Sequence, residues 1–266
     1  MLLRMTLATL LLGLVATAAQ AQLVVGTDEA TNGDIFLVDV GTGVATSILS
    51  GPDAEAWGLA YDSDTNTLYW NNGAALYSSP YSAGGLTPTL LGDMMFSGST
   101  LVAVSLTFRD GMLYATKNIS TEAVYEVDPG TLNATQVYVY DSLFDFGGLG
   151  VDVTTNLMYG LSDATGGGQG RGLYEIDIPG QTEIFRAPYP AGETDIDGLA
   201  CYDGLAYYVI DQPGNFYIFD IASGTQVGTL PSPFPGSEVF SAATYIDEGA
   251  VPVEPSTWGG IKGMYR

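Results

Sequence analysis

Carboxylates recur at one position before a repeated pentapeptide, and they are the residues of this chain best suited to chemistry. The pentapeptides GLAYD, SLTFR, GLGVD, GLACY and SAATY begin at Gly58, Ser105, Gly148, Gly198 and Ser241. Three residues before these starting points stand Glu55, Val102, Asp145, Asp195 and Glu238. Converging carboxylates repel one another unless a cation or solvent compensates, and calcium prefers oxygen ligands. The pattern predicts a metal site for calcium formed by the four acidic residues; alternatively, each side chain points to water or caps a turn.

A second set of residues is suited to ligand contact rather than to metal binding. Asp197 adds a carboxylate directly before Gly198. Most aromatic residues recur at repeat positions, which indicates packing, but four fall near predicted loops. We therefore predict a ligand-binding surface, for a sugar or a peptide, that includes Trp57, Tyr81, Phe144, Tyr189 and Asp197.

The segment GLAYDSDTNTLYW also alternates oxygen-bearing side chains, at Asp62, Asp64 and Asn66. A calcium loop would need a glycine and a downstream acidic ligand at fixed offsets, and Leu68 and Tyr69 stand in that region instead. Two other copies of the segment have a bare Asp-Gly turn at this place. The alternation therefore predicts a hairpin turn.

Composition excludes several classes of function. The chain has no histidine, so a Ser-His-Asp or Cys-His relay is impossible, and Cys201 is its only cysteine. With 7 basic and 30 acidic residues the net charge is −23, which opposes binding to nucleic acid or to anionic membrane surfaces. Divalent cations or basic partners are the ligands that such a charge attracts.

Two motifs in constant order show how the carboxylates must be positioned. Tyr69, Tyr114, Tyr159 and Tyr207 occupy matched positions, at spacings of 45, 45 and 48 residues. A second motif follows each, as in VYEVD, LYEID and FYIFD, with ALYSS as a degenerate copy. Alternating apolar and polar residues predict strands, and Asn-Gly and Asp-Gly dipeptides predict tight hairpins. No amphipathic helix is expected.

A period of this length with four short strands per unit is typical of a β-propeller. The N-terminal unit lacks a first strand, and FSAATYID (240–247) supplies it at the other end of the chain. The sequence thus predicts an all-β fold of five four-stranded blades, closed by a C-terminal strand that completes the N-terminal blade. The blades are expected at 22–54 with 240–247, 55–99, 100–144, 145–192 and 193–239.

The repeat resembles those of secreted propellers of the YWTD, NHL and YVTN families, because a GLAYD-like strand is followed by LYW. The resemblance covers residues 22–247. It implies extracellular binding modules or, in other members, calcium-dependent lactonases and lyases.

The two ends of the chain have different characters. Residues 1–21 predict a signal peptide, with Arg4, an apolar core over 7–15 and an Ala-Gln-Ala cleavage site. Residues 22–249 form the expected propeller and 250–266 a tail. Glu254 to Trp258 resembles the opening of a PEP-CTERM sorting signal, although the apolar span of such signals is missing. The tail is either a segment read by a secretion apparatus or surface partner, or a disordered end.

These observations predict a secreted, extracellular or periplasmic monomer that binds an extracellular protein or glycan without catalysis. It is not expected to insert into a membrane after signal cleavage. The alternative is a metal-assisted hydrolase or lyase whose carboxylates line the mouth of the central channel.

Overall fold

The computed structural model describes residues 22–29, 33–117, 122–140, 143–166 and 169–247. The predicted signal peptide and tail lie outside these residues. The described part forms 22 β-strands and one 3₁₀ helix, η1 (Pro52–Ala54). It contains no helix with the length and apolar character needed to span a bilayer.

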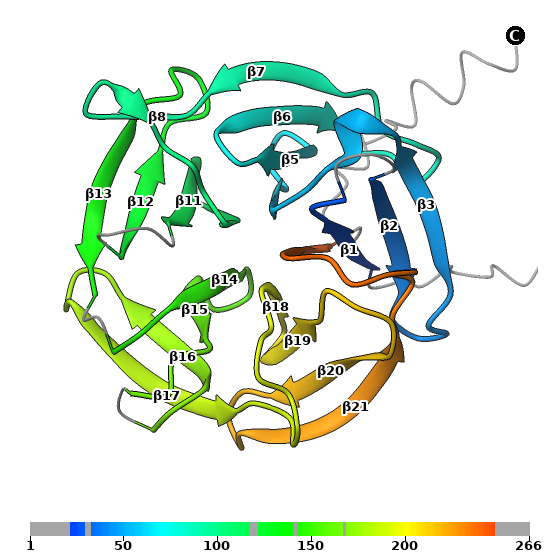
Figure 1. The fold of residues 1–266 in the computed structure, drawn as a ribbon, viewed down its shortest axis with the longest axis vertical. Coiled ribbons are helices and arrows are strands. Elements are labelled where there is room, and N and C mark those ends of the chain that lie inside the picture. The colour runs from blue at the N-terminus through cyan, green and yellow to red at the C-terminus, as the bar shows by residue number, and fades with distance from the viewer. Residues whose placement is uncertain (1–21, 30–32, 118–121, 141–142, 167–168, 248–266) are drawn as a thin grey trace, which may run out of the picture.

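Twenty of the strands form five four-stranded antiparallel sheets around a common centre (Figure 1). The first blade has the strand order β22-β1-β2-β3, and the next β4-β5-β6-β7. Their bounds are β22 (Ser241–Ile246), β1 (Gln22–Thr27), β2 (Asp34–Asp39), β3 (Ala45–Ser50), β4 (Gly58–Asp62), β5 (Thr67–Asn72), β6 (Ala75–Pro80) and β7 (Thr89–Asp93).

The other three blades each contain four strands that are consecutive in sequence. The third blade is β10 (Ser105–Arg109), β11 (Met112–Lys117), β12 (Ala123–Val127) and β13 (Ala134–Val139). The fourth is β14 (Phe146–Asp152), β15 (Leu157–Ser162), β16 (Gly172–Asp177) and β17 (Thr182–Pro188). The fifth is β18 (Gly198–Tyr202), β19 (Leu205–Val209), β20 (Asn215–Asp220) and β21 (Thr225–Pro231). A small hairpin, β8 (Met95–Phe96) and β9 (Ser99–Thr100), links the second and third blades.

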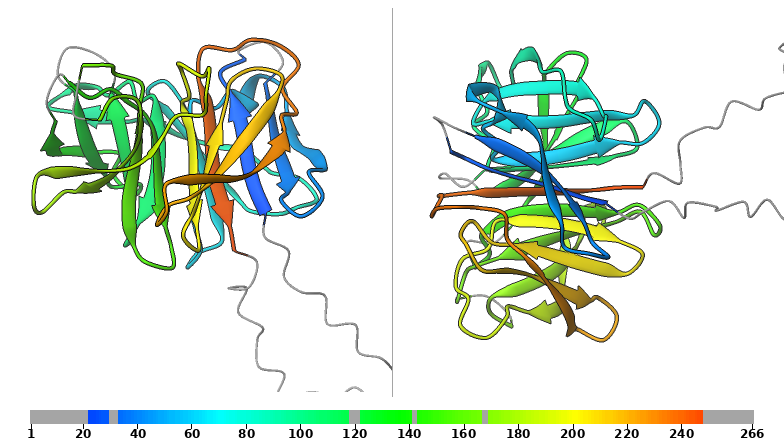
Figure 2. Two further views of the ribbon diagram at one scale, coloured as in Figure 1. Left: turned by 90° about the horizontal axis from the view of Figure 1, so that it is seen from below. Right: turned by 90° about the vertical axis from the view of Figure 1, so that its right-hand side faces the viewer.

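The ring closes as predicted. β22 pairs antiparallel with β1, from Gln22↔Ile246 to Thr27↔Ser241, and becomes the inner strand of the N-terminal blade. β1 therefore begins and β22 ends at the same face of the ring, as the side views show (Figure 2). This five-bladed, all-β architecture confirms the predicted fold.

In the second and fourth blades, the close approach of the next inner strand requires glycine at the first position of the pentapeptide. A Cβ atom added to Gly58 would lie 2.3 Å from the backbone nitrogen of Leu106, and one added to Gly148 would lie 2.3 Å from the Asp197 carbonyl oxygen. Ser241 occupies the same position in the first blade, where its hydroxyl accepts a hydrogen bond from Gly198 N (2.9 Å) and donates one to Val209 O (2.6 Å). The recurring Gly or Ser of the pentapeptides thus joins neighbouring blades.

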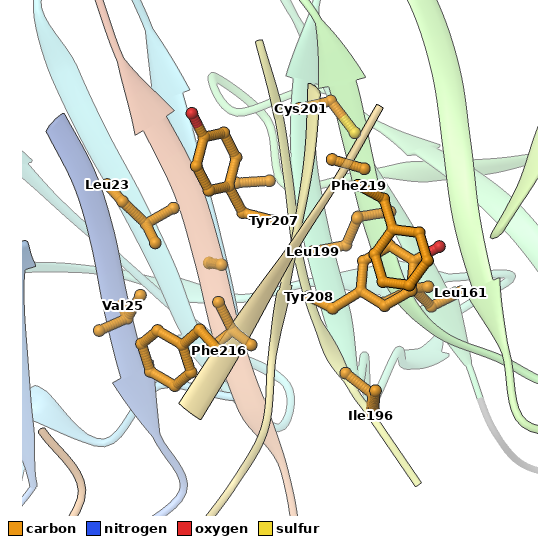
Figure 3. Packing of buried hydrophobic residues seen from close by; sticks show 14 of the residues in the cluster. Leu23, Val25, Leu161, Ile196, Leu199, Cys201, Tyr207, Tyr208, Phe216 and Phe219 are labelled. Carbon is orange, nitrogen blue, oxygen red and sulfur yellow. The ribbon is translucent and has the colours of Figure 1, made fainter. Parts of the chain in front are cut away.

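Apolar side chains fill the spaces between blades. One cluster combines the fourth, fifth and first blades, and includes Leu161, Leu199, Tyr207, Phe216 and Leu23 (Figure 3). All five are buried, and burial of this apolar area is the main favourable term in folding. Cys201, the free thiol, lies within the same cluster.

The outer edge of every blade is irregular. The pairing between the third and fourth strands shifts register once in each of the five blades. Bulges of this kind twist an edge strand away from the flat geometry that another strand could extend.

Aspartates of the repeat cap hairpins. The Asp62 carboxylate accepts hydrogen bonds from Asp64 N (2.9 Å) and from the Thr65 hydroxyl (2.6 Å), which confirms the predicted turn. Asp152 accepts bonds from Thr154 N (2.9 Å) and, in the next blade, from Gly204 N (2.9 Å). The aspartates of the second motif likewise accept bonds from backbone amides of their own turns; they are Asp39, Asp128, Asp177 and Asp220.

Candidate functional site

The two faces of the ring differ in which strand ends they present. Neighbouring inner strands lie in parallel register, because Gly58 approaches Ser105 and Leu106, and Gly148 approaches Asp197. We call the face where inner strands begin the acidic face. The opposite face, where β22 ends and β1 begins, is the terminal face.

A cavity of about 230 Å³ opens on the acidic face near the centre of the ring. It is built by the fourth, fifth and first blades, from the segments that enter β14, β18 and β22 and from the residue that follows β15. Its lining residues are Asp145, Gly147, Asp163, Asp195, Asp197, Val239 and Phe240. We call this the mouth cavity.

Backbone hydrogen bonds hold the aspartates of the fourth blade side by side. Asp145 N donates to the Ser162 hydroxyl (3.1 Å), and Asp163 N donates to Asp145 O (3.2 Å). Arg171 Nε donates to the carbonyl oxygen of Asp163 (2.6 Å), so its nearby charge partly compensates the carboxylates. The absence of a side chain at Gly147 makes room for Asp197, since a Cβ there would lie 2.0 Å from Asp197 Oδ1.

Burial and mutual repulsion make these carboxyls reluctant to ionise. Burial, followed by the charges of Asp145 and Asp195, raises the pKa of Asp163 to about 6. The pKa of Asp145 rises because of burial and Asp195, although a hydrogen bond with Asp163 opposes part of the rise. Burial, then Asp195 and Asp163, holds the pKa of Asp197 well above its usual range. The mouth cavity thus concentrates negative charge where the protein compensates it poorly.

The acidic surface extends on both sides of the mouth cavity. On one side, burial and the Asp145 charge raise the pKa of Glu122 to about 7, and its Oε2 atom is buried without a hydrogen-bond partner. On the other side, burial and the charge of Asp195 raise the pKa of Asp211 to about 6.

The structure brings together two of the four residues predicted to form a calcium site. Asp145 and Asp195 line the mouth cavity, whereas Glu55 accepts hydrogen bonds from Trp57 Nε1 (3.0 Å) and Asn72 Nδ2 (2.5 Å). Glu238 lies beside other acidic residues, since burial and then the charges of Glu29, Asp28 and Asp211 raise its pKa.

Within the described residues, no three or more His, Cys, Asp or Glu side chains are grouped so that they could hold a metal ion. Their side chains do not form a calcium coordination shell, which takes six to eight oxygen ligands. Calcium binding stays a prediction.

The residues predicted to contact a ligand fall into two groups. Asp197 lines the mouth cavity, and the Trp57 ring packs 5.0 Å from the ring of Phe240, which also lines it. Three aromatics instead pack within or between blades. The Phe144 ring stacks on Phe146 (5.6 Å), the Tyr81 hydroxyl donates to Gln22 Oε1 (2.7 Å), and the Tyr189 hydroxyl donates to Ile196 O (3.2 Å).

Sequence reasoning missed Asp163, Asp211 and Glu122. The first two carry a readable signal, because they stand four residues after the matched tyrosines Tyr159 and Tyr207. That offset places both carboxylates just beyond the second strand of their blades, at the acidic face. Glu122 precedes the third strand β12 and has no such counterpart.

Comparison with known proteins identifies the fold and no more. No protein-family model and no curated protein matches the chain. A chain in a crystal structure of a nidogen/laminin complex is similar in structure, with a TM-score of 0.60 and 15% sequence identity. The similarity covers 85% of this chain and 98% of that chain. It confirms the β-propeller fold, and because 718 chains of solved structures match, the fold alone selects no function.

Proposed function

We propose that the protein is a secreted, non-enzymatic binding module whose acidic face binds a basic segment of an extracellular protein. The observation that carries the proposal is the group of four aspartates around the mouth cavity. Asp145, Asp163, Asp195 and Asp197 share a cavity of about 230 Å³ with an apolar border formed by Val239 and Phe240.

A cationic side chain compensates the charge of these carboxylates better than water does. A lysine ammonium or arginine guanidinium donates charge-assisted hydrogen bonds and removes the repulsion among the carboxylates. Its aliphatic stem can pack against Val239, whose exposed fraction is 64%, and against the Phe240 ring. An uncharged glycan would leave the repulsion in place, so a protein is the better partner for this face.

The leader-like pattern of residues 1–21 supports the proposal of secretion, and the irregular edges of all five blades support action as a monomer. The metal-assisted hydrolase or lyase is the weaker alternative. It needs several carboxylates on one cation, whereas Glu55 is engaged by Trp57 and Asn72.

The test is titration calorimetry of residues 22–266 with a hexalysine peptide at about 20 mM and about 200 mM salt. We expect saturable binding that Asp145→Asn/Asp195→Asn weakens by at least about tenfold. The matched control Asp64→Asn/Asp203→Asn makes the same change in net charge at two exposed turns of the terminal face. An equal loss of affinity in both double variants would mean that hexalysine responds only to net charge, and the proposal would fail.

A further inference from the structure

A second depression lies on the terminal face, away from the mouth cavity. It has a volume of about 170 Å³ and is formed where the hairpins of the second, third and fourth blades meet. The lining residues that bear on its chemistry are Tyr61, Asp64, Phe108, Arg109, Asp110 and Asn156. We call it the hairpin groove.

Arg109 departs from the repeat at the position that carries hairpin-capping aspartates in neighbouring blades. Asp62 and Asp152 end their inner strands and accept hydrogen bonds from the backbone of the following turn. In the third blade the turn is the tight Asp110-Gly111 pair, with both residues at positive φ (52° and 84°). A tight turn of this kind needs no capping carboxylate, so the repeat does not account for an arginine here.

The charge of Arg109 is partly compensated within the fold. Burial and the hydrogen bond to Glu126 raise the pKa of Tyr114, and a hydrogen bond with Arg109 opposes that rise. The Arg109 side chain is 17% exposed, and Nε is buried without a hydrogen-bond partner. The nearest carboxylate oxygen, Asp110 Oδ2, lies 3.9 Å from Nε, and the guanidinium carbon lies 4.9 Å from the centre of the Tyr114 ring. A largely buried guanidinium is costly unless its donors are used, so the part of the side chain that remains exposed favours a ligand that accepts hydrogen bonds.

Acceptors stand next to these donors. Asp110 is 71% exposed and is oriented by Asn156 Nδ2, which lies 3.3 Å from one carboxylate oxygen and 3.4 Å from the other. Asp64, also exposed, adds a further carboxylate. The two carboxylates therefore repel an anionic ligand in the groove, while Arg109 repels a cationic one.

Aromatic surface completes the groove. Phe108 packs one ring face on Tyr69, with ring centres 6.0 Å apart and planes 5° apart, so its orientation is fixed. Tyr61 lies in the neighbouring inner strand and lines the same groove. Aromatic rings in a polar groove suit a ligand with one apolar face.

We propose that the hairpin groove binds a neutral oligosaccharide. The hydroxyls of a sugar ring accept hydrogen bonds from Arg109 and donate them to Asp110, and its C–H face packs on Phe108. Because the ligand is uncharged, it escapes the repulsion that the net charge of −23 imposes on anionic glycans. This second site is separate from the protein-binding surface proposed for the acidic face.

The test is saturation-transfer NMR on residues 22–266 with cellotetraose and tetra-N-acetylchitotetraose as neutral probes. A sulfated heparin tetrasaccharide and a chitosan tetramer serve as the anionic and cationic comparisons. We expect transfer to at least one neutral probe, and a loss of affinity of at least about tenfold in Arg109→Met and in Phe108→Leu. Thermal melts establish that both variants fold.

Asp195→Asn, on the opposite face, should leave oligosaccharide binding unchanged, and Arg109→Met should leave hexalysine binding unchanged. The proposal is overturned if neither neutral probe shows transfer, if both groove variants bind as the parent does, or if only a charged oligosaccharide binds. These outcomes do not depend on whether the acidic face binds hexalysine.

Discussion

Aspartates on the two faces of the ring differ in the hydrogen bonds that their carboxylates accept. On the terminal face, Asp62 and Asp152 accept hydrogen bonds from the amides of their own hairpins, and Asp152 also holds Gly204 of the next blade. On the acidic face, no hydrogen bond from a described residue reaches the carboxylates of Asp195 or Asp197. The first group stabilises the fold, whereas the second receives no hydrogen bond from the described part of the fold.

The pKa shifts follow the same division. Hydrogen bonds from the hydroxyl and the amide of Ser223 hold the pKa of Asp220, on the terminal face, below its usual range. Burial and like charge raise those of Asp145, Asp163 and Asp197 on the acidic face. The capping aspartates of the repeat thus gain stability from the fold, whereas burial and like charge oppose ionisation of the carboxyls at the mouth cavity.

The largest effect is expected from removing a capping aspartate. Asp152 is fully buried, and Asp152→Ala leaves Thr154 N and Gly204 N without their acceptor. The free energy of unfolding should fall by roughly 3 kcal/mol, which lowers the Tm by about 6–12 °C for a domain of this size. Circular dichroism melts measure this change.

The matched change on the acidic face is Asp195→Ala. It removes a carboxylate that repels its neighbours, so the Tm should stay level or rise. A loss of stability comparable with that of Asp152→Ala would contradict the division between the two faces.

A smaller effect is expected from pH. Because the pKa values of Asp163 and Glu122 are raised to about 6 and about 7, the folded chain binds more protons than the unfolded chain between about pH 4 and 7. Stability therefore falls as pH rises through this window. The Tm should be on the order of 3 °C higher at about pH 5 than at about pH 7.5.

The control for the pH effect is Asp163→Asn/Glu122→Gln, in which the difference between the two pH values should shrink by about half. An unchanged difference would assign the pH dependence to groups elsewhere in the chain.

The smallest effect is expected from calcium. Adding about 2 mM calcium to chelator-treated protein should raise the Tm by on the order of 1–2 °C, because the ion screens the mouth carboxylates. Asp145→Asn/Asp195→Asn should abolish this shift, and Glu55→Gln should retain it, since Glu55 is held by Trp57 and Asn72. Differential scanning fluorimetry measures the Tm of each variant with and without calcium. Loss of the shift in Glu55→Gln would instead support the four-residue site predicted from the repeat.

The fold could be predicted because the same strand pattern recurs along the sequence, once for each blade. The matched tyrosines, the second motif and the missing first strand of the N-terminal unit together specify blade number, strand order and closure. A repeated local pattern that agrees with the global arrangement leaves few alternatives.

The candidate site was only partly predictable, because it depends on segments that do not repeat. Alignment found Asp145, Asp195 and Asp197, which enter inner strands of adjacent blades. The alignment placed Glu55 in the same group because it also stands three residues before a pentapeptide. In the structure, however, Trp57 and Asn72 donate hydrogen bonds to the Glu55 carboxylate. The connections between strands differ from blade to blade, and offset alone does not determine where such side chains point.

The pairing of Gln22 with Ile246 has a practical consequence for how the molecule can be presented to others. Anything joined to either end of the propeller, whether a carrier protein, an affinity tag or a sensor surface, stands behind the ring on the terminal face. The acidic face then points away from the attachment. Many copies fixed to one support would present the mouth cavity outward together, whereas the hairpin groove would lie on the side nearer the support.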